Sequence, residues 1–316
     1  MKRTLMKATL LAITIGLSSA GAAAGDVVKL ILSAAPGGPQ DRVSRLVLPA
    51  LSAALGKTVI VDYRGGAGGT LASNAVAKSP PDGETLLVTT FSYVLTAGSM
   101  SNLPYDPRKD LEPIYLLGEA QTMLVARPSL GVANLKELAA KARDGKLNYG
   151  SNGVAGTMHL GAELFARTAG VQMTNIPYRG AAPALTDLLA GMVDVANADV
   201  PLLQPYVKDG RLKGLAIFDS RRSPLLPDVP TSVEQGMAQL QMTSWIGVMA
   251  PKGTPPAVRQ KLVQSFSEAL RQPELVKQLA ELGYANPRAD LAFKAKLDKD
   301  FEFWIPWLKN AGIRAE

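Results

Sequence analysis

The chain has 316 residues, of which 47% are hydrophobic, enough to form two hydrophobic cores rather than one large one. Its formal net charge of +7 comes without a dense Lys/Arg run carrying interleaved aromatic residues, so the composition gives little support to nucleic-acid binding and at most a mild attraction for a small anion. No cysteine and one histidine are present, which excludes disulfides, a cysteine nucleophile, a cysteine-based zinc site and a multi-histidine metal site.

The N-terminus has the three parts of a secretory signal peptide. Cations within the first seven residues precede an uncharged run from Ala8 to Ala20, and the small residues 22–24 follow. The apolar part is about ten residues long, whereas a membrane-spanning helix needs roughly twenty. We therefore expect residues 1–24 to be cleaved and the mature chain to be exported to the periplasm. An uncleaved anchor is the alternative.

Between residues 27 and 90, apolar β-branched runs alternate with glycine-rich turns and helical spacing. Strands that alternate with helices indicate a parallel α/β sheet. The expected elements are a strand over 27–34, a turn over 36–39 followed by a helix, a strand over 59–64, a glycine turn over 65–69, a helix ending at 77 and a strand over 85–90.

A second α/β series follows residue 128. Its expected elements are a helix over 135–142, a strand over 147–151, a helix over 157–168, a strand over 193–200, a short helix over 202–207 and a strand over 212–218.

The C-terminal part contains a strand over 245–251 and three helices. The first carries an apolar stripe at every fourth residue from Val258 to Leu270, which predicts a core-facing side. In the second, which opens at Pro273, we expect Val276, Leu279 and Leu282 to point inward. The aromatic and aliphatic residues of the last helix are interpreted as packing rather than as a stacking platform for a ligand: Leu297, Phe301, Trp304 and Leu308.

Few residues could support catalysis. The only histidine, His159, could be half of a Ser-His-Asp set with Ser151, which leaves an exported hydrolase as one hypothesis. The segment around Ser151 lacks the G-x-S-x-G elbow, however, and we expect His159 to orient a loop or contact a ligand. No catalytic residue, metal ligand or cofactor is therefore assigned.

Four small-residue loops each precede a predicted helix. They span 36–41, 65–69, 151–159 and 178–183. The loop over 65–69 does not match a P-loop or G-x-G-x-x-G, and taken alone each loop could be only a tight turn. Together they place several helix N-termini at the carboxyl ends of strands, where backbone N–H groups can hold a carboxylate. Asp199 either receives an ammonium or hydroxyl group of the ligand or caps the end of its strand.

At these loops the chain resembles the solute receptors of tripartite tricarboxylate transporters, also called Bug receptors. The resemblance covers nearly the whole mature chain. It is carried by Ala35–Asp41, Tyr63–Gly69, Pro80–Gly83, Leu103–Pro107, Asn148–Tyr149, His159–Leu160, Glu163–Phe165, Pro177–Gly180, Ala184–Leu189 and, most distinctively, Arg222–Thr231.

The resemblance implies an α/β, type II periplasmic binding protein fold with a ligand cleft between two lobes joined by crossing strands. Lobe 1 would comprise residues 26–122 and 246–316, and lobe 2 residues 123–245. It implies ligand binding by Pro36, Gly37, Gly38, Asp41, Ala67, Gly68, Thr90 and Ser92 from lobe 1, and by Ser151, Gly153, Thr157, His159, Tyr178, Arg179 and Gly180 from lobe 2. The acid of the family motif is shifted by one position, to Asp199, which reverses the direction of a strand side chain.

The leading hypothesis is a monomeric periplasmic receptor that closes around a small organic carboxylate and delivers it to membrane transporter subunits. No enzymatic activity, metal, cofactor or nucleic acid is expected. The alternative is a receptor that presents the bound ligand to a membrane sensor kinase.

Overall fold

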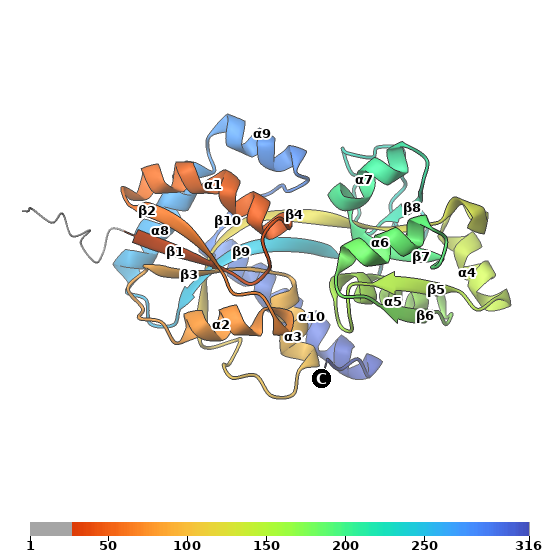
Figure 1. The fold of residues 1–316 in the computed structure, drawn as a ribbon, viewed down its shortest axis with the longest axis horizontal. Helices are drawn as coiled ribbons and strands as arrows, with labels where there is room; N and C mark the ends of the chain where they lie inside the picture. Colours follow the sequence, from red (N-terminus) through yellow and green to blue (C-terminus); the bar gives the residue numbers. More distant parts are fainter. Residues whose placement is uncertain (1–26, 316) are drawn as a thin grey trace, which may run out of the picture.

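A computed structural model describes residues 27–315, so the predicted signal peptide lies outside the described residues. The strands form one ten-stranded sheet in the order β2-β1-β3-β9-β4-β7-β5-β6, with β8 and β10 each paired to β4. Figure 1 shows two bodies of secondary structure connected by β4 (Leu111–Ala126) and β9 (Thr243–Pro251). The architecture is the two-lobed α/β fold expected from the sequence.

We name the two bodies by their elements. Lobe 1 contains β1 (Val27–Leu32), α1 (Pro39–Leu55), β2 (Thr58–Tyr63), α2 (Thr70–Ala77), β3 (Thr85–Thr90), α3 (Ser92–Ser99), α8 (Pro256–Ala269), α9 (Pro273–Glu281), β10 (Arg288–Ala289) and α10 (Asp290–Ala311). Lobe 2 contains α4 (Leu135–Asp144), β5 (Asn148–Ser151), α5 (Thr157–Ala169), β6 (Thr174–Pro177), α6 (Ala181–Leu189), β7 (Val195–Asp199), α7 (Val200–Lys208) and β8 (Lys213–Ile217). The predicted lobe boundaries, after residues 122 and 245, fall within β4 and β9 and stay a prediction.

The sheet is mixed, which corrects the prediction of a parallel sheet. Strand β1 pairs in parallel with β2 and β3, and β5 with β6 and β7. The pairs β3 with β9, β9 with β4 and β4 with β7 are antiparallel. The chain enters lobe 2 through β4 and returns through β9, so these two strands must run in opposite directions. The 16 residues of β4 were not predicted, because Pro113, Gly118 and Glu119 interrupt the apolar pattern.

Helices form where apolar residues recur at helical spacing. Helix α1 starts with Pro39 and buries Val43, Val47, Leu51 and Leu55 along one side. Helix α10 buries the predicted stripe from Leu297 to Leu308, so Phe301 and Trp304 pack in the core as expected. In α9 the prediction was partly wrong: Leu275 and Leu279 are buried, whereas Val276 is 40% exposed, because the helix turns a different face to α1.

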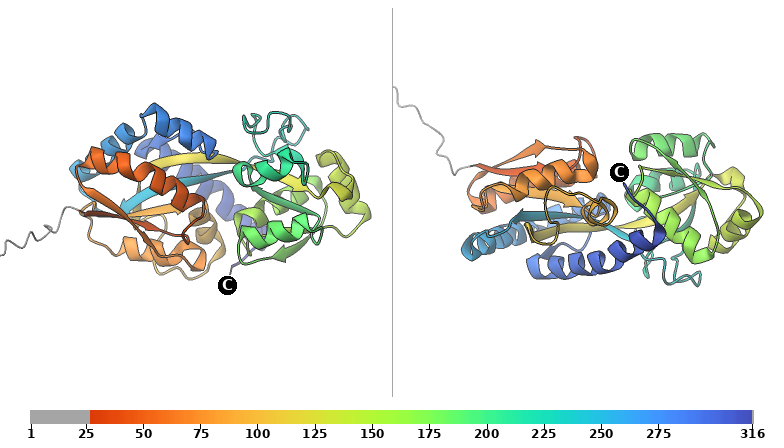
Figure 2. Two further views of the ribbon diagram at one scale, coloured as in Figure 1. Left: turned by 45° about the horizontal axis from the view of Figure 1, so that its top comes forward. Right: turned by 90° about the horizontal axis from the view of Figure 1, so that it is seen from below.

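Helices cover both faces of the sheet. In lobe 1, α1 and α8 pack on one face together with Leu86 and Val88, while α3 and α10 pack on the other face with Leu87. The end of α10 lies beside α5 of lobe 2 (Figure 2), where Arg167 Nη2 donates to Ala311 O over 3.0 Å. With both faces covered, the loops at the ends of the strands remain free to bind a ligand.

Candidate functional site

The carboxyl ends of strands from both lobes point toward the same region. Because β3 is antiparallel to β9, β9 to β4 and β4 to β7, strands β3 and β7 run toward each other. Strands β1 and β2 run with β3, and β5 and β6 run with β7. The loops that follow these strands therefore face one another across the crossing strands (Figure 1), at the place where open α/β sheets bind ligands.

In lobe 1, the loops after β1 and β2 touch through glycine. A Cβ at Gly65 would lie 3.3 Å from the backbone of Ala34 and Ala35, so a side chain there would push the loops apart. Gly68 has φ of +64°, and a Cβ there would lie 2.7 Å from Thr96 Oγ1, which donates to Gly68 O over 3.0 Å. The predicted residues of these loops are thus brought together, as one surface of lobe 1.

Asp41 organises that surface from inside. Its carboxylate accepts hydrogen bonds from Gly37 N (2.8 Å), Arg45 Nε (2.7 Å) and Tyr63 OH (2.5 Å). Hydrogen bonds from Tyr63, Gly37 and Arg45 outweigh burial and hold the pKa of Asp41 below its ordinary value. The residue is 5% exposed. A direct ligand contact of Asp41 stays a prediction, because the structure engages its carboxylate in holding the turn.

The end of β3 adds hydroxyl groups to the site. Thr90 Oγ1 and Ser92 Oγ lie 2.8 Å apart, and Ser92 N donates to Thr90 Oγ1 over 3.3 Å. Phe91 N donates to Trp245 O on β9 over 3.2 Å, which ties this corner to a crossing strand. Both hydroxyl groups belong to partly exposed residues beside the facing loops.

In lobe 2, the loop between β5 and α5 holds a strained alanine. Ala155 has φ of +57°, and only two other non-glycine residues of the described chain, Ala67 and Asn286, have positive φ. Ala67 lies in the facing loop of lobe 1. Such conformations are unfavourable for residues with a Cβ and gather at functional sites. The strain at Ala155 is compensated by a hydrogen bond from its N–H to His159 Nδ1, 3.0 Å away.

That hydrogen bond sets the chemistry of His159. Since Nδ1 accepts, the proton of the neutral ring is on Nε2, which leaves an N–H donor. Burial lowers the pKa of His159, so the ring stays neutral at neutral pH. Ser151 Oγ has no hydrogen-bond partner in the described protein, so Ser151 and His159 do not form the nucleophile and base pair that the hydrolase hypothesis required.

The loop after β6 completes the lobe 2 side. Tyr178 N donates to Ser151 O over 2.9 Å, and Tyr178 OH donates to Asp187 Oδ2 over 2.6 Å. Arg179 is exposed and takes part in no ion pair among residues 27–315. Its guanidinium is therefore available for an anion.

Four helices begin at the facing loops, and each has glycine as its N-cap: Gly38 for α1, Gly69 for α2, Gly156 for α5 and Gly180 for α6. None of these N-caps has a side chain that could accept a hydrogen bond from the first turn. The positive ends of the helix dipoles and the first N–H groups therefore point to the region between the loops. The arrangement suits a carboxylate.

Asp199 ends β7 and occupies the N-cap position of α7, but its side chain makes no capping hydrogen bond, so the structure does not support the capping alternative. Burial raises its pKa to about 6, against a hydrogen bond from Ser244 that lowers it. In the register of the sheet, Asp199 pairs with Thr122 on β4 and Ser244 with Ala120. The carboxyl therefore lies where lobe 2 meets the crossing strands.

The sequence did not identify three polar residues near these loops. Gln40 is buried and its Nε2 donates to Ser33 Oγ (3.0 Å) and Val88 O (2.8 Å), which joins the first loop to β3. Asn197 is buried on β7, and Ser244 lies on β9. An asparagine within an otherwise apolar strand was the one available signal.

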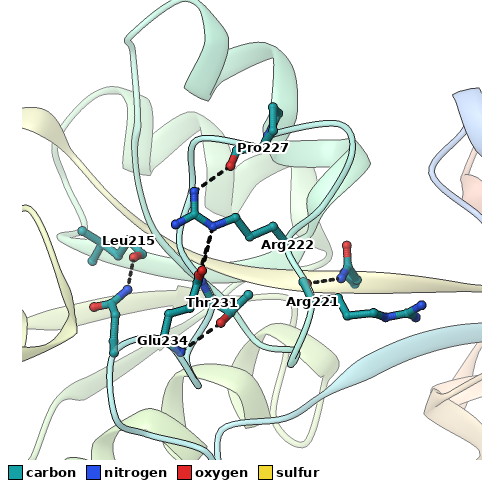
Figure 3. Close-up of polar contacts among 8 residues, drawn as sticks. Leu215, Arg221, Arg222, Pro227, Thr231 and Glu234 are labelled. Carbon is teal, nitrogen blue, oxygen red and sulfur yellow. Dashed lines mark hydrogen bonds and ion pairs between the residues drawn. The ribbon is translucent and has the colours of Figure 1, made fainter.

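The distinctive segment Arg222–Thr231 lies outside the site. Arg222 Nε donates to both carboxylate oxygens of Glu234 (3.0 Å each) and Arg222 Nη1 to Pro227 O (2.9 Å), while Thr231 N donates to Glu234 Oε2 (2.7 Å) (Figure 3). A cavity of about 530 Å³ lies beside this segment, between Lys208, Lys213 and Pro230, and includes none of the predicted site residues. The segment stabilises lobe 2.

Within residues 27–315, no group of three or more histidine, aspartate or glutamate residues is arranged to hold a metal ion. In the same part of the chain, no helix is both long and apolar enough to cross a membrane.

Comparison with known proteins finds a family match over most of the chain. Residues 43–299 match the tripartite tricarboxylate transporter family receptor. The structure is similar to that of the periplasmic binding protein BugD, with 32% identity, a TM-score of 0.80 and coverage of 92% of this chain and 99% of BugD. It is also similar to MatC of Rhodopseudomonas palustris with bound malate, with 32% identity, a TM-score of 0.79 and coverage of 89% of this chain and 98% of MatC. A third similar structure is R. palustris Rpa4515 with adipate, with 30% identity, a TM-score of 0.82 and coverage of 91% of this chain and 97% of Rpa4515.

Proposed function

The chain belongs to the tripartite tricarboxylate transporter receptor family of periplasmic binding proteins, and from this premise we propose that it captures a small organic carboxylate between its two lobes and delivers it to the membrane subunits of such a transporter. Members of the family are solute-binding receptors, and this chain is a receptor rather than an enzyme. Capture would take place in the periplasm after removal of residues 1–24.

The observation that carries the proposal is the meeting of four glycine-capped helix N-termini from both lobes. Their glycine N-caps supply no side-chain acceptor, so most of the first N–H groups are left as donors; Met158 N of α5, which donates to Asn152 Oδ1, is already engaged. Arg179 adds a cation, and His159 Nε2 adds a neutral donor. Acceptors are scarce by comparison, because Asp41 already binds three donors within lobe 1.

The two-sided arrangement favours a ligand with two anionic ends. Lobe 1 contributes the N-termini of α1 and α2, and lobe 2 those of α5 and α6. A diacid could place one carboxylate against each lobe. The malate and adipate bound by the two similar proteins are of this chemical class.

Capture requires the lobes to approach each other. None of the hydrogen bonds within residues 27–315 joins the loops of lobe 1 to the facing loops of lobe 2, and most of the residues in these loops are exposed or partly exposed. A ligand that binds both sets of loops would stabilise a closed arrangement by bending β4 and β9. Membrane subunits could then distinguish the loaded receptor from the empty one.

Thermal unfolding in the presence of small carboxylates tests the proposal. Protein that mass spectrometry shows to be ligand-free should melt at higher temperature with a matching mono-, di- or tricarboxylate, and the shift should grow with ligand concentration. Esters or amides of the same acids serve as controls and should give no shift. Unchanged melting across the panel would contradict carboxylate capture.

Gene deletion separates transport from sensing. If the chain serves a transporter, deletion abolishes uptake of the identified acid. If it serves a sensor kinase, deletion abolishes transcriptional induction by that acid and leaves uptake intact.

A further inference from the structure

Two buried side chains of lobe 2 have polar atoms that no protein group binds. Ser151 and Asn197 are both 0% exposed. Within the described part of the chain, Ser151 Oγ, Asn197 Oδ1 and Asn197 Nδ2 have no hydrogen-bond partner. Leaving such groups unpaired is costly, and nearly all of them in native proteins bind protein atoms or ordered water.

The two side chains are neighbours in the sheet. Strands β5 and β7 pair in parallel, with Tyr149 opposite Val195 and Gly150 opposite Ala196. Extending this register by one position places Ser151 beside Asn197, with both side chains on the same face as Tyr149 and Val195. Paired strands lie about 4.8 Å apart, a distance that one water molecule bridges with two ordinary hydrogen bonds. An internal water makes about three hydrogen bonds, and the pair offers three unpaired polar atoms.

Helix α5 is adapted to this asparagine. Gly161 is buried in α5, and a Cβ at that position would overlap the Asn197 amide. The surrounding side chains Leu160, Leu164 and Phe165 are apolar and buried. Glycine at position 161 of α5 therefore leaves the space that the Asn197 amide of β7 occupies.

We propose that Ser151 and Asn197 together hold one internal water molecule beneath α5, and that this water positions both ligand loops of lobe 2. Ser151 connects the two loops, because its carbonyl accepts from Tyr178 N (2.9 Å) and the next residue, Asn152, accepts from Met158 N through Oδ1 (3.1 Å). A water bound to Ser151 Oγ holds this junction in place. The water site is independent of ligand binding, whereas its effect on the ligand rests on the proposed function.

A double-mutant cycle tests the shared water. Ser151→Ala and Asn197→Val each remove one side of the site with a similar side-chain volume. Each single substitution should raise the unfolding equilibrium constant by about tenfold. The double variant should be no less stable than the less stable of the two single variants, because the water is lost only once. Ser232→Ala is the matched control: it is a buried serine of lobe 2 whose Oγ donates to Leu240 O (2.6 Å), and its effect should add to that of Asn197→Val.

Several results would overturn the proposal. Additive effects of Ser151→Ala and Asn197→Val, or a gain in stability from Asn197→Val, would show that no partner is shared. A high-resolution crystal structure of the unaltered protein without a water between the two side chains would do the same, even if the variants fail to fold.

Ligand affinity tests the positioning role. Asn197→Val should weaken binding of the identified carboxylate several-fold, whereas Ser232→Ala should not. Unchanged affinity alongside clear coupling would refute the positioning role alone. If no carboxylate binds, the proposed function fails, while the cycle and the crystal structure still decide the water site.

Discussion

Replacing Asp41 by asparagine tests whether this carboxylate holds the first loop. The substitution keeps the size of the side chain and turns one accepting oxygen into a donor. If the amide oxygen stays with Tyr63 and Arg45, the new NH2 group faces Gly37 N–H, and a part-buried hydrogen bond to a charged carboxylate is lost. That loss costs about 1–3 kcal/mol. The side chain of Arg45 is 61% exposed, so solvent screens its ion pair with Asp41 and the pair adds little.

We therefore expect Asp41→Asn to lower the free energy of unfolding by about 1–3 kcal/mol at neutral pH, measured by urea denaturation of ligand-free protein. Because the folded pKa of Asp41 lies below the unfolded value, its contribution is complete above about pH 5 and is lost as pH falls through the folded pKa. The difference between wild type and variant should therefore shrink in acid.

Asp209→Asn is the matched control for this prediction. Asp209 also pairs with an arginine, Arg211, over 2.7 Å, but both side chains are exposed. Solvent screens this pair, so its loss should leave the free energy of unfolding almost unchanged. An Asp41→Asn variant that is no less stable than Asp209→Asn would refute the role of Asp41 in holding the loop.

Three further predictions follow from the site. Gly161→Ala should lower stability by about 1–3 kcal/mol in denaturant titrations, and the same substitution should cost clearly less in an Asn197→Ala background if overlap with Asn197 is the cause. Asp199→Asn should stabilise ligand-free protein by up to about 3 kcal/mol at pH 8, because a carboxyl with a pKa raised to about 6 destabilises the fold as pH rises from 4 to 6. The gain in stability should vanish near pH 4, and an equal gain at pH 4 and pH 8 would contradict this explanation. Arg179→Gln should weaken carboxylate binding about tenfold in calorimetry and reduce its dependence on salt, and an equal loss in the exposed control Arg211→Gln would argue against a local effect.

The predicted elements depended on local patterns. The strand over 85–90 and the apolar stripe of the last helix were confirmed because a continuous β-branched run and a regular helical spacing are visible within one segment. Strand β4 was missed because its apolar pattern is broken by Pro113 and Gly118, and its partners come from residues far along the chain. The exposure of Val276 was missed because periodicity alone does not say which side of a helix meets its neighbour.

In the candidate site, too, features of the local backbone were predictable and contacts between distant segments were not. Glycine-rich corners before helices predicted anion-binding N–H groups, since those groups come from the local backbone. The sequence could not show that Tyr63 binds Asp41, because that contact depends on how the end of β2 packs against α1. The Ser151–Asn197 pair likewise depends on the register of two strands separated by two helices and another strand.

By itself, the sequence determined the two α/β series, the likeness to a receptor family and the loops that could bind an anion, because composition and short-range periodicity reflect local hydrogen bonding and burial. Only the tertiary structure decided that the strands of the two lobes run toward each other, that the Asp199 side chain makes no capping bond to α7, and that Ser151 and Asn197 keep buried polar atoms without a protein partner. Those features arise from long-range strand pairing and helix packing, in which each side chain's surroundings are supplied by residues distant in the chain.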